Sequence, residues 1–180
     1  MSELRDAERP DEAVSNPRFS AMAVANYYVD CALGEGAGVT NMALQKILYF
    51  ADGIYLAGRG RPLFGEKIEA WNYGPVIPEV YHEFKHHGAK PIKEQGKVLE
   101  LRGGLELWRS ETPTIPRRRD TASDRQLLDS VWEDYGHRSA VELMRESHRR
   151  GGPWAQVFRP GARHLVIPQD LMREYFSAHQ

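Results

Sequence analysis

One stretch of the chain predicts a helix with apolar residues on nearly every side, and such a helix fits a soluble fold only at its centre. From residue 40 to residue 58 the sequence reads TNMALQKILYFADGIYLAG. Thr40 is suited to cap this helix because its hydroxyl can accept a hydrogen bond from a first-turn amide, and Gly58 and Gly60 supply a stop. A narrow polar stripe interrupts the apolar surface: Asn41, Gln45, Tyr49 and Asp52. The helix from Thr40 to Ala57 is therefore predicted to be the core around which the rest of the chain packs.

The flanking segments predict further helices and a small sheet. Apolar periodicity and capping residues place helix starts near Ser20, Pro78, Ser123, Ser139 and Pro168. Two of these starts are predicted to be capping boxes, Ser123 with Gln126 and Ser139 with Glu142. Alternation over residues 67–72 predicts one strand, and Gly103-Gly104 between two short apolar runs predicts a hairpin. Together these strands suggest one small antiparallel sheet. The predicted fold class is mainly α (α+β), in a single domain.

Composition narrows the classes of function. The chain has 180 residues and a formal net charge of −1, so it fits one domain and has no bulk electrostatic attraction to nucleic acid or to an anionic membrane. Its single cysteine, Cys31, cannot form an internal disulfide and is predicted to pack as a small hydrophobe. No apolar run approaches the length of a membrane span and the N-terminus is charged, so the expected compartment is the cytoplasm.

The first 18 residues differ from the rest of the chain. They are rich in charge and hold almost nothing that a core could bury. Such a segment is predicted to be a disordered tail, followed by the folded domain at residues 19–180.

Residues 82–86, HEFKH, match the HExxH motif of zinc proteases. On a helix, His82 and His86 would lie one turn apart, with Glu83 as general base. However, Gly88 follows almost at once, Ile92 stands where a metzincin would place its third histidine, and no third ligand is evident downstream. Zinc proteolysis is kept as an alternative, while no metal, catalytic residue or cofactor is expected.

A second alternative is a DNA-binding regulator. Arg117, Arg118 and Arg119 form a local basic run in a proline-rich loop. Acidic residues are interspersed and no recognition helix follows, so the run is more typical of a solvated face, and nucleic acid is not expected as a partner.

Several separate segments of the sequence resemble a known family. They are LQKILYFADGIYLA, RPLF, EAWNYGPVIPEVYHEFK and ESHRRGGPW, and the resemblance covers roughly Ser20 to Phe176. The chain is similar in these segments to the Panacea domain, also called the SocA-like or phage-associated GepA-like family. The resemblance implies a non-enzymatic antitoxin of a bacterial or phage toxin–antitoxin pair, which binds a cognate toxin. It implies two possible modes, masking the toxin and presenting it to an ATP-dependent protease.

A partner-binding surface is predicted where large aromatic residues accompany a Gly/Pro-rich turn, since exposed aromatics are good interface anchors. The predicted contacts are Trp71, Tyr73 and Pro75 in the turn, Lys46 and Tyr49 on the central helix, and Trp108 in the hairpin. Each of these side chains has an alternative interpretation as part of the core.

Overall fold

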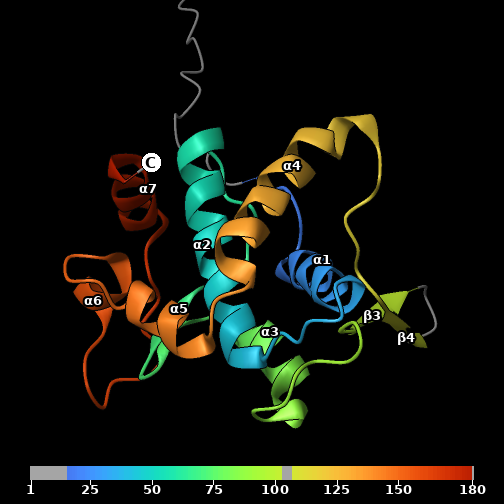
Figure 1. The fold of residues 1–180 in the computed structure, drawn as a ribbon, viewed down its shortest axis with the longest axis horizontal. Helices are drawn as coiled ribbons and strands as arrows, with labels where there is room; N and C mark the ends of the chain where they lie inside the picture. The colour runs from blue at the N-terminus through green and yellow to red at the C-terminus, as the bar shows by residue number, and fades with distance from the viewer. Residues whose placement is uncertain (1–15, 103–106, 180) are drawn as a thin grey trace, which may run out of the picture.

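Helix α2 (Asn41–Arg59) lies at the centre of the molecule, as predicted (Figure 1). The computed structural model describes residues 16–102 and 107–179, without the side chains of Arg102 and Leu107. Helices α1 (Ala21–Gly34) and α4 (Ala122–Val131) lie on one side of α2, and α5 (Ala140–Ser147) and α7 (Gln169–Ala178) on the other. The prediction of a mainly α (α+β) fold is confirmed.

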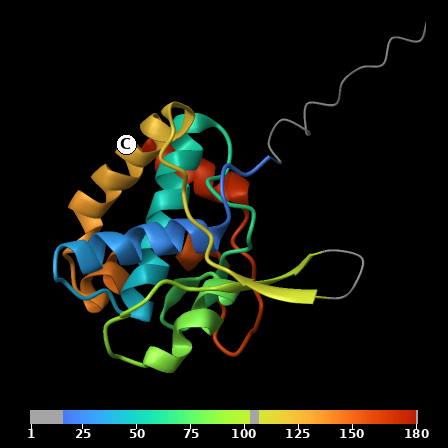
Figure 2. The same ribbon diagram turned by 90° about the vertical axis from the view of Figure 1, so that its right-hand side faces the viewer.

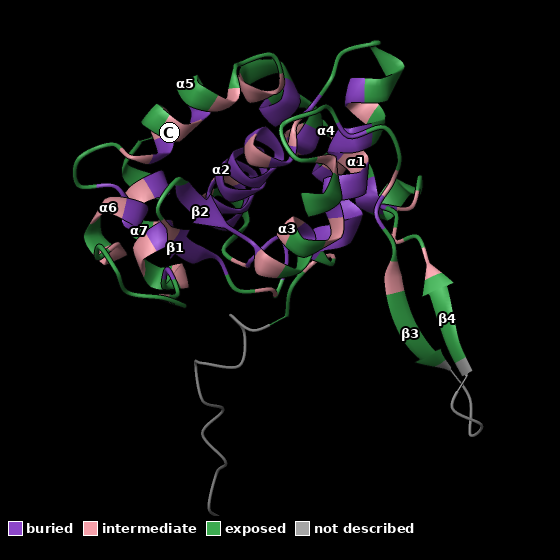
Figure 3. Cartoon of the chain, turned by 90° about the horizontal axis from the view of Figure 1, so that it is seen from below, coloured by how far each residue is buried: buried purple, intermediate pink, exposed green. Residues whose placement is uncertain are grey.

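Helix α2 begins and ends at the capping residues that the sequence predicts. The Thr40 hydroxyl accepts a hydrogen bond from the Ala43 amide, and Gly60 ends the helix in the left-handed conformation with φ 71°. A residue without a Cβ adopts that conformation at little cost. Between these caps most residues of the helix are buried, so the helix contributes to the core on nearly all of its sides (Figure 3).

The remaining helices are short. Helix α3 (Pro78–Phe84) continues as the 3-10 turn η2 (Lys85–His87), and the 3-10 turn η3 (Arg119–Thr121) leads into α4. Helix α4 passes into the π-helical turn η4 (Trp132–Gly136), and α6 (Pro153–Val157) precedes α7.

The two predicted capping boxes have different outcomes. Ser139 and Glu142 form theirs at the start of α5, as predicted. The box predicted at Ser123 is wrong: the chain already turns as a 3-10 helix from Arg119, so α4 begins at Ala122 and Ser123 lies inside its first turn.

The strands form two separate sheets, so the prediction of one sheet is wrong. Strand β1 (Glu69–Trp71) pairs with β2 (Gly74–Val76) across a two-residue turn, and β3 (Val98–Arg102) pairs with β4 (Leu107–Glu111). Gly74 has φ 105°, which allows the chain to reverse directly after β1. Local pairing across this turn therefore replaces pairing between residues 67–72 and the hairpin.

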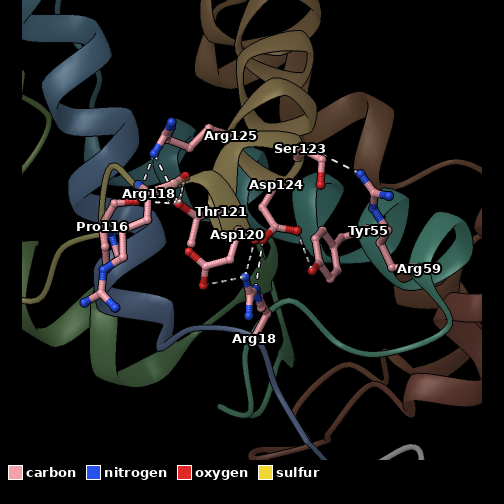
Figure 4. A network of polar contacts seen from close by, with 10 residues as sticks. All are labelled: Arg18, Tyr55, Arg59, Pro116, Arg118, Asp120, Thr121, Ser123, Asp124 and Arg125. Atoms are coloured by element: carbon pink, nitrogen blue, oxygen red, sulfur yellow. Dashed lines mark hydrogen bonds and ion pairs between the residues drawn. The ribbon is translucent and has the colours of Figure 1, made fainter.

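A polar network fastens the beginning of the described chain to α4 (Figure 4). The Arg18 guanidinium donates to Asp124 Oδ2 (2.8 Å) and to the Asp120 carbonyl (2.6 Å), and the Tyr55 hydroxyl donates to Asp124 Oδ1 (2.9 Å). Of the predicted tail, residues 1–15 lie outside the described residues, whereas Arg18, its last member, is held by these contacts.

Two further observations concern the sequence-based expectations. Cys31 is half-buried against the core, and burial raises the pKa of its thiol to about 11, as expected of a packing residue. No helix in the described part of the chain is long and apolar enough to cross a membrane.

Candidate partner-binding surfaces

The polar stripe of α2 faces inward and holds the segment that wraps around the helix. Three of its side chains and the adjacent Lys46 bind backbone groups of residues 63–81. Asn41 Nδ2 donates to Tyr81 O (3.0 Å), Gln45 Oε1 accepts from Ile77 N (2.9 Å), Lys46 Nζ donates to Pro75 O (3.0 Å) and Asp52 Oδ1 accepts from Leu63 N (2.9 Å). A buried backbone group without a partner is costly, so these side chains fix the path of the segment.

Three of the predicted contact residues are consequently buried. Lys46 is only 1% exposed, and burial lowers the pKa of its ammonium group to about 7. Tyr49 packs against Phe176, with ring centroids 5.5 Å apart, and Pro75 is buried within β2. These side chains stabilise the fold and offer a partner almost no surface, although Lys46 borders the groove described next.

Trp71 and Tyr73 lie on a groove of about 980 Å³ between the start of α2, the β1–β2 turn, α3 and residues 161–164. Tyr73, at the tip of the turn, is 70% exposed, whereas Trp71 is half-buried. The indole of Trp71 donates to Glu69 Oε2 (2.8 Å), and its carbonyl accepts from the indole of Trp154 (2.8 Å). The second bond ties β1 to α6 (Pro153–Val157), so Tyr73 projects from an anchored turn.

The groove also contains charged and titratable groups. The Glu69 carboxylate lies 3.3 Å from Nδ1 of His164, in the segment that runs beside β1, and His164 adopts a positive φ of 57° that is uncommon outside glycine. Aromatic walls with a few convergent polar groups are typical of ligand and peptide sites. The groove is therefore one candidate surface for a partner.

The HExxH residues do not form the arrangement that a zinc protease needs. His82 lies beside Trp71 and Tyr81 on the groove, with ring centroids 6.4 Å and 5.5 Å away. Helix α3 ends at Phe84, so His86 falls in the following 3-10 turn. Within residues 16–102 and 107–179, the one group of three potential metal ligands brings His86 together with His87 and Glu94, without His82. The physical reason is the early end of the helix, which breaks the one-turn spacing of the motif.

The hairpin β3–β4 is the second candidate surface, because it projects from the body of the molecule (Figure 2). In its register Leu101 lies opposite Trp108, and Leu99 lies opposite Ser110. Residues directly opposite each other, and residues two apart, share a face of a sheet. Leu99, Leu101 and Trp108 therefore form one apolar strip, here called the hairpin ridge, and they are 69%, 54% and 65% exposed.

The base of the hairpin is clamped by one buried side chain of α1. Asn26 accepts from the Gly96 amide (2.7 Å) and donates to the carbonyls of Gly96 (3.0 Å) and Pro113 (2.8 Å). Gly96 precedes β3 and Pro113 follows β4, so one amide holds both ends of the hairpin. The ridge is thereby presented outside the core on an anchored support.

The contacts predicted from the sequence include Trp108 but not Leu99 and Leu101. The signal was present, because alternation in residues 98–101 places both leucines on one face. Their register with Trp108 required the hairpin pairing that only the structure supplies.

The arginines at 117–119 are exposed in the loop before α4. Asp120 is adjacent to them, and its carbonyl accepts from the guanidinium of Arg18 (2.6 Å). The basic run thus sits beside an acidic residue on a loop and does not lie on a long helix.

Comparison with known proteins places these surfaces in context. Residues 44–155 match the family described as Antitoxin SocA-like, Panacea domain, and this range includes the groove turn and the hairpin. The chain is also 39% identical over 134 residues to Antitoxin SocA of Caulobacter vibrioides (strain NA1000 / CB15N), a match that covers 74% of this chain and 68% of that protein. No solved structure gives a significant match.

Proposed function

The chain belongs to the SocA-like antitoxin family with the Panacea domain, and from this premise we propose that it neutralises a cognate toxin by binding it directly. The relative with 39% identity bears the name of an antitoxin. The proposed role is that of a binding protein without catalytic residues or a cofactor. It acts in the cytoplasm, where a co-encoded toxin would be made.

The observation that carries the proposal is the hairpin ridge. Exposed large apolar side chains that cluster on one face mark protein interaction sites more often than scattered ones do. Here two leucines and a tryptophan, each more than half exposed, share a face of a hairpin whose base is clamped by Asn26. Tryptophan is also enriched among the residues that dominate binding energies. We therefore assign the ridge as the surface that meets the toxin.

The groove beside Tyr73 supports a second contact. The β1–β2 turn that borders the groove lies on the other side of α3 from the hairpin (Figure 3), and none of the ridge residues lines the groove, so the two surfaces do not overlap. Two separate surfaces would let one molecule hold a toxin on the ridge while the groove engages another protein. An ATP-dependent protease that destroys the presented toxin is the partner we propose for this mode, with masking by the ridge as the simpler mode.

Calorimetric titration of the purified neighbouring gene product into this protein tests the proposal. We expect Trp108→Ala to weaken the affinity by about 30-fold or more, as loss of a 2 kcal/mol anchor would. Arg109→Ala is the matched control, since Arg109 lies on the opposite face of the same hairpin. Tyr73→Ala should leave toxin affinity intact but prolong the half-life of the toxin in cells that contain the protease.

Each outcome bears on a different part of the proposal. Unchanged affinity in Trp108→Ala would contradict the ridge, and loss of affinity in Tyr73→Ala would move the toxin surface to the groove. If the neighbouring product does not bind at all and its expression is harmless without this protein, the antitoxin role itself fails.

A further inference from the structure

We propose that His86, His87 and Glu94 form a binding site for a divalent transition metal ion, with Zn²⁺ as the best match. Each residue offers one ligand atom, and the three atoms lie within 4.8 Å of one another. Ligands about 2.0–2.1 Å from one zinc ion lie between about 3 and 4 Å apart, so small side-chain rotations bring the three atoms onto a shared ion. His86 and Glu94 are exposed, which leaves the site open to ions from solution.

The tautomer of His86 suits a metal ligand. Its Nδ1 lies 2.9 Å from the Glu83 carbonyl oxygen. A carbonyl can only accept a hydrogen bond, so Nδ1 carries the proton and Nε2 keeps its lone pair for a metal. A ligating histidine usually donates its other N–H in this way, to a carbonyl or a carboxylate that fixes the orientation of the ring.

His87 also has a ring nitrogen that the protein does not satisfy. Its Nε2 is buried and has no hydrogen-bond partner among the described residues, although buried polar atoms usually have one. The rings of His86 and His87 lie with centroids 4.1 Å apart. Two neutral imidazoles in contact can share one cation, whereas two protonated ones would repel each other.

The donor set indicates which ion is preferred. Two imidazole nitrogens and one carboxylate oxygen form a set that proteins use for zinc, and imidazole also suits nickel, cobalt and copper. Lys85, Lys90 and Lys93 are exposed nearby in the chain and disfavour a cation. We therefore expect micromolar affinity, with water in the remaining coordination position.

A metal ion bound at this site would connect two segments of the chain. His87 lies in η2 and Glu94 lies seven residues later, between Ile92, whose amide donates to Val39 O (2.9 Å), and Gly96, which Asn26 holds. A metal would join the end of α3–η2 to the segment that leads into the hairpin. It would thus close the turn at Gly88 and stabilise the folded state by mass action.

Zinc titration of the tag-free, EDTA-treated full chain by calorimetry tests the site. We expect one ion per chain with a Kd at or below about 10 µM, and at least about a tenfold loss of affinity in each of His87→Ala and Glu94→Gln. His82→Ala is the matched control, since it removes the other histidine of the HExxH sequence and should leave the affinity unchanged. Cobalt in place of zinc should give visible absorption in the wild type that both ligand variants lose.

A second measurement guards against misfolded variants. Zinc should raise the melting temperature of the wild type and of His82→Ala, but not of Glu94→Gln, whose metal-free melting temperature should match the wild type. A wild-type Kd above about 100 µM, or full affinity in both ligand variants, overturns the site. Loss of binding in His82→Ala would overturn it in favour of a His82–His86 pair. The measurements need no toxin, so their result is independent of the proposed antitoxin role.

Discussion

Helix α2 and the β3–β4 hairpin depart in opposite directions from the usual distribution of side chains. Helix α2 buries an ammonium group, a carboxyl group and two amides, whereas the hairpin exposes two leucines and a tryptophan. Each of these four groups of α2 has a backbone partner within the chain. The apolar ridge of the hairpin lies in solvent. Buried polar side chains that find hydrogen-bond partners within the chain stabilise the fold, whereas a cluster of exposed apolar side chains indicates a surface for another molecule.

The largest difference in stability is expected between leucine-to-alanine variants of the two regions. Leu48 is fully buried on α2, so Leu48→Ala should lower the free energy of unfolding by about 2–5 kcal/mol through lost burial and a residual cavity. Leu99→Ala on the ridge should change it by less than about 0.5 kcal/mol. Urea denaturation measures both. Similar losses in the two variants would show that the ridge is packed against the rest of the molecule and does not lie in solvent.

The buried ammonium group of Lys46 should make the free energy of unfolding depend on pH. Its pKa is 10.5 as a free side chain and about 7 in the fold, because burial disfavours the charged form. Between these values the unfolded chain binds more protons than the folded one, so the free energy of unfolding rises with pH from 7 to 10.5. Lys46→Met should remove this rise, which amounts to about 5 kcal/mol at most. His148, the titratable neighbour, has a lowered pKa and titrates below this window.

Asp52 should act with the opposite sign and in a different window. Burial raises the pKa of its carboxyl group from 3.8 to about 7, and Glu66 adds to the rise by charge repulsion. The folded state therefore holds more protons between pH 3.8 and 7, and the free energy of unfolding falls as pH rises through that range. Asp52→Asn keeps an oxygen for the Leu63 amide and should flatten this limb. If Lys46→Met and Asp52→Asn both keep the wild-type pH profile of the free energy of unfolding, the two groups are more hydrated than their burial in α2 implies.

The Asn26 clamp, which joins α1 to the base of the hairpin, should have the next largest effect on stability. Asn26→Ala removes the partners of Gly96 and Pro113, so the free energy of unfolding should fall by about 1–3 kcal/mol. Hydrogen exchange should increase in β3 and β4 while the amides of α2 stay protected. Toxin affinity should fall as well, although Asn26 is fully buried and cannot touch a partner. Unchanged exchange in the hairpin would mean that other contacts orient the ridge.

Local signals predicted the parts of this fold that local contacts determine. The Thr40 cap and the Ser139–Glu142 capping box depend on residues within one turn, and the central position of α2 depends on the apolar pattern along that helix alone; all three are confirmed. The family and its antitoxin character were evident from separate segments of the sequence, which the comparisons bear out.

Long-range pairing decided the features that sequence reasoning missed. The polar stripe of α2 faces residues 63–81, and no periodicity within the helix identifies those partners. Likewise the two short strands after residue 68 pair with each other because Gly74 permits a reversal, so the expected shared sheet does not form. The ridge depends on strand register, and the metal ligands come together because α3 ends early.

The smallest effect on stability is expected for side chains that are exposed and charged. Arg117, Arg118 and Arg119 are exposed, like the ridge, but charged side chains at the surface are well solvated and need no partner. Replacing all three by serine should change the free energy of unfolding by less than about 0.5 kcal/mol and leave toxin affinity intact. The wild-type protein should bind DNA only in a salt-sensitive, sequence-indifferent way, because arginine contacts to phosphate carry no sequence information. A footprint at its own promoter in physiological salt, lost in the triple variant, would instead make this loop a functional surface and establish the regulator alternative.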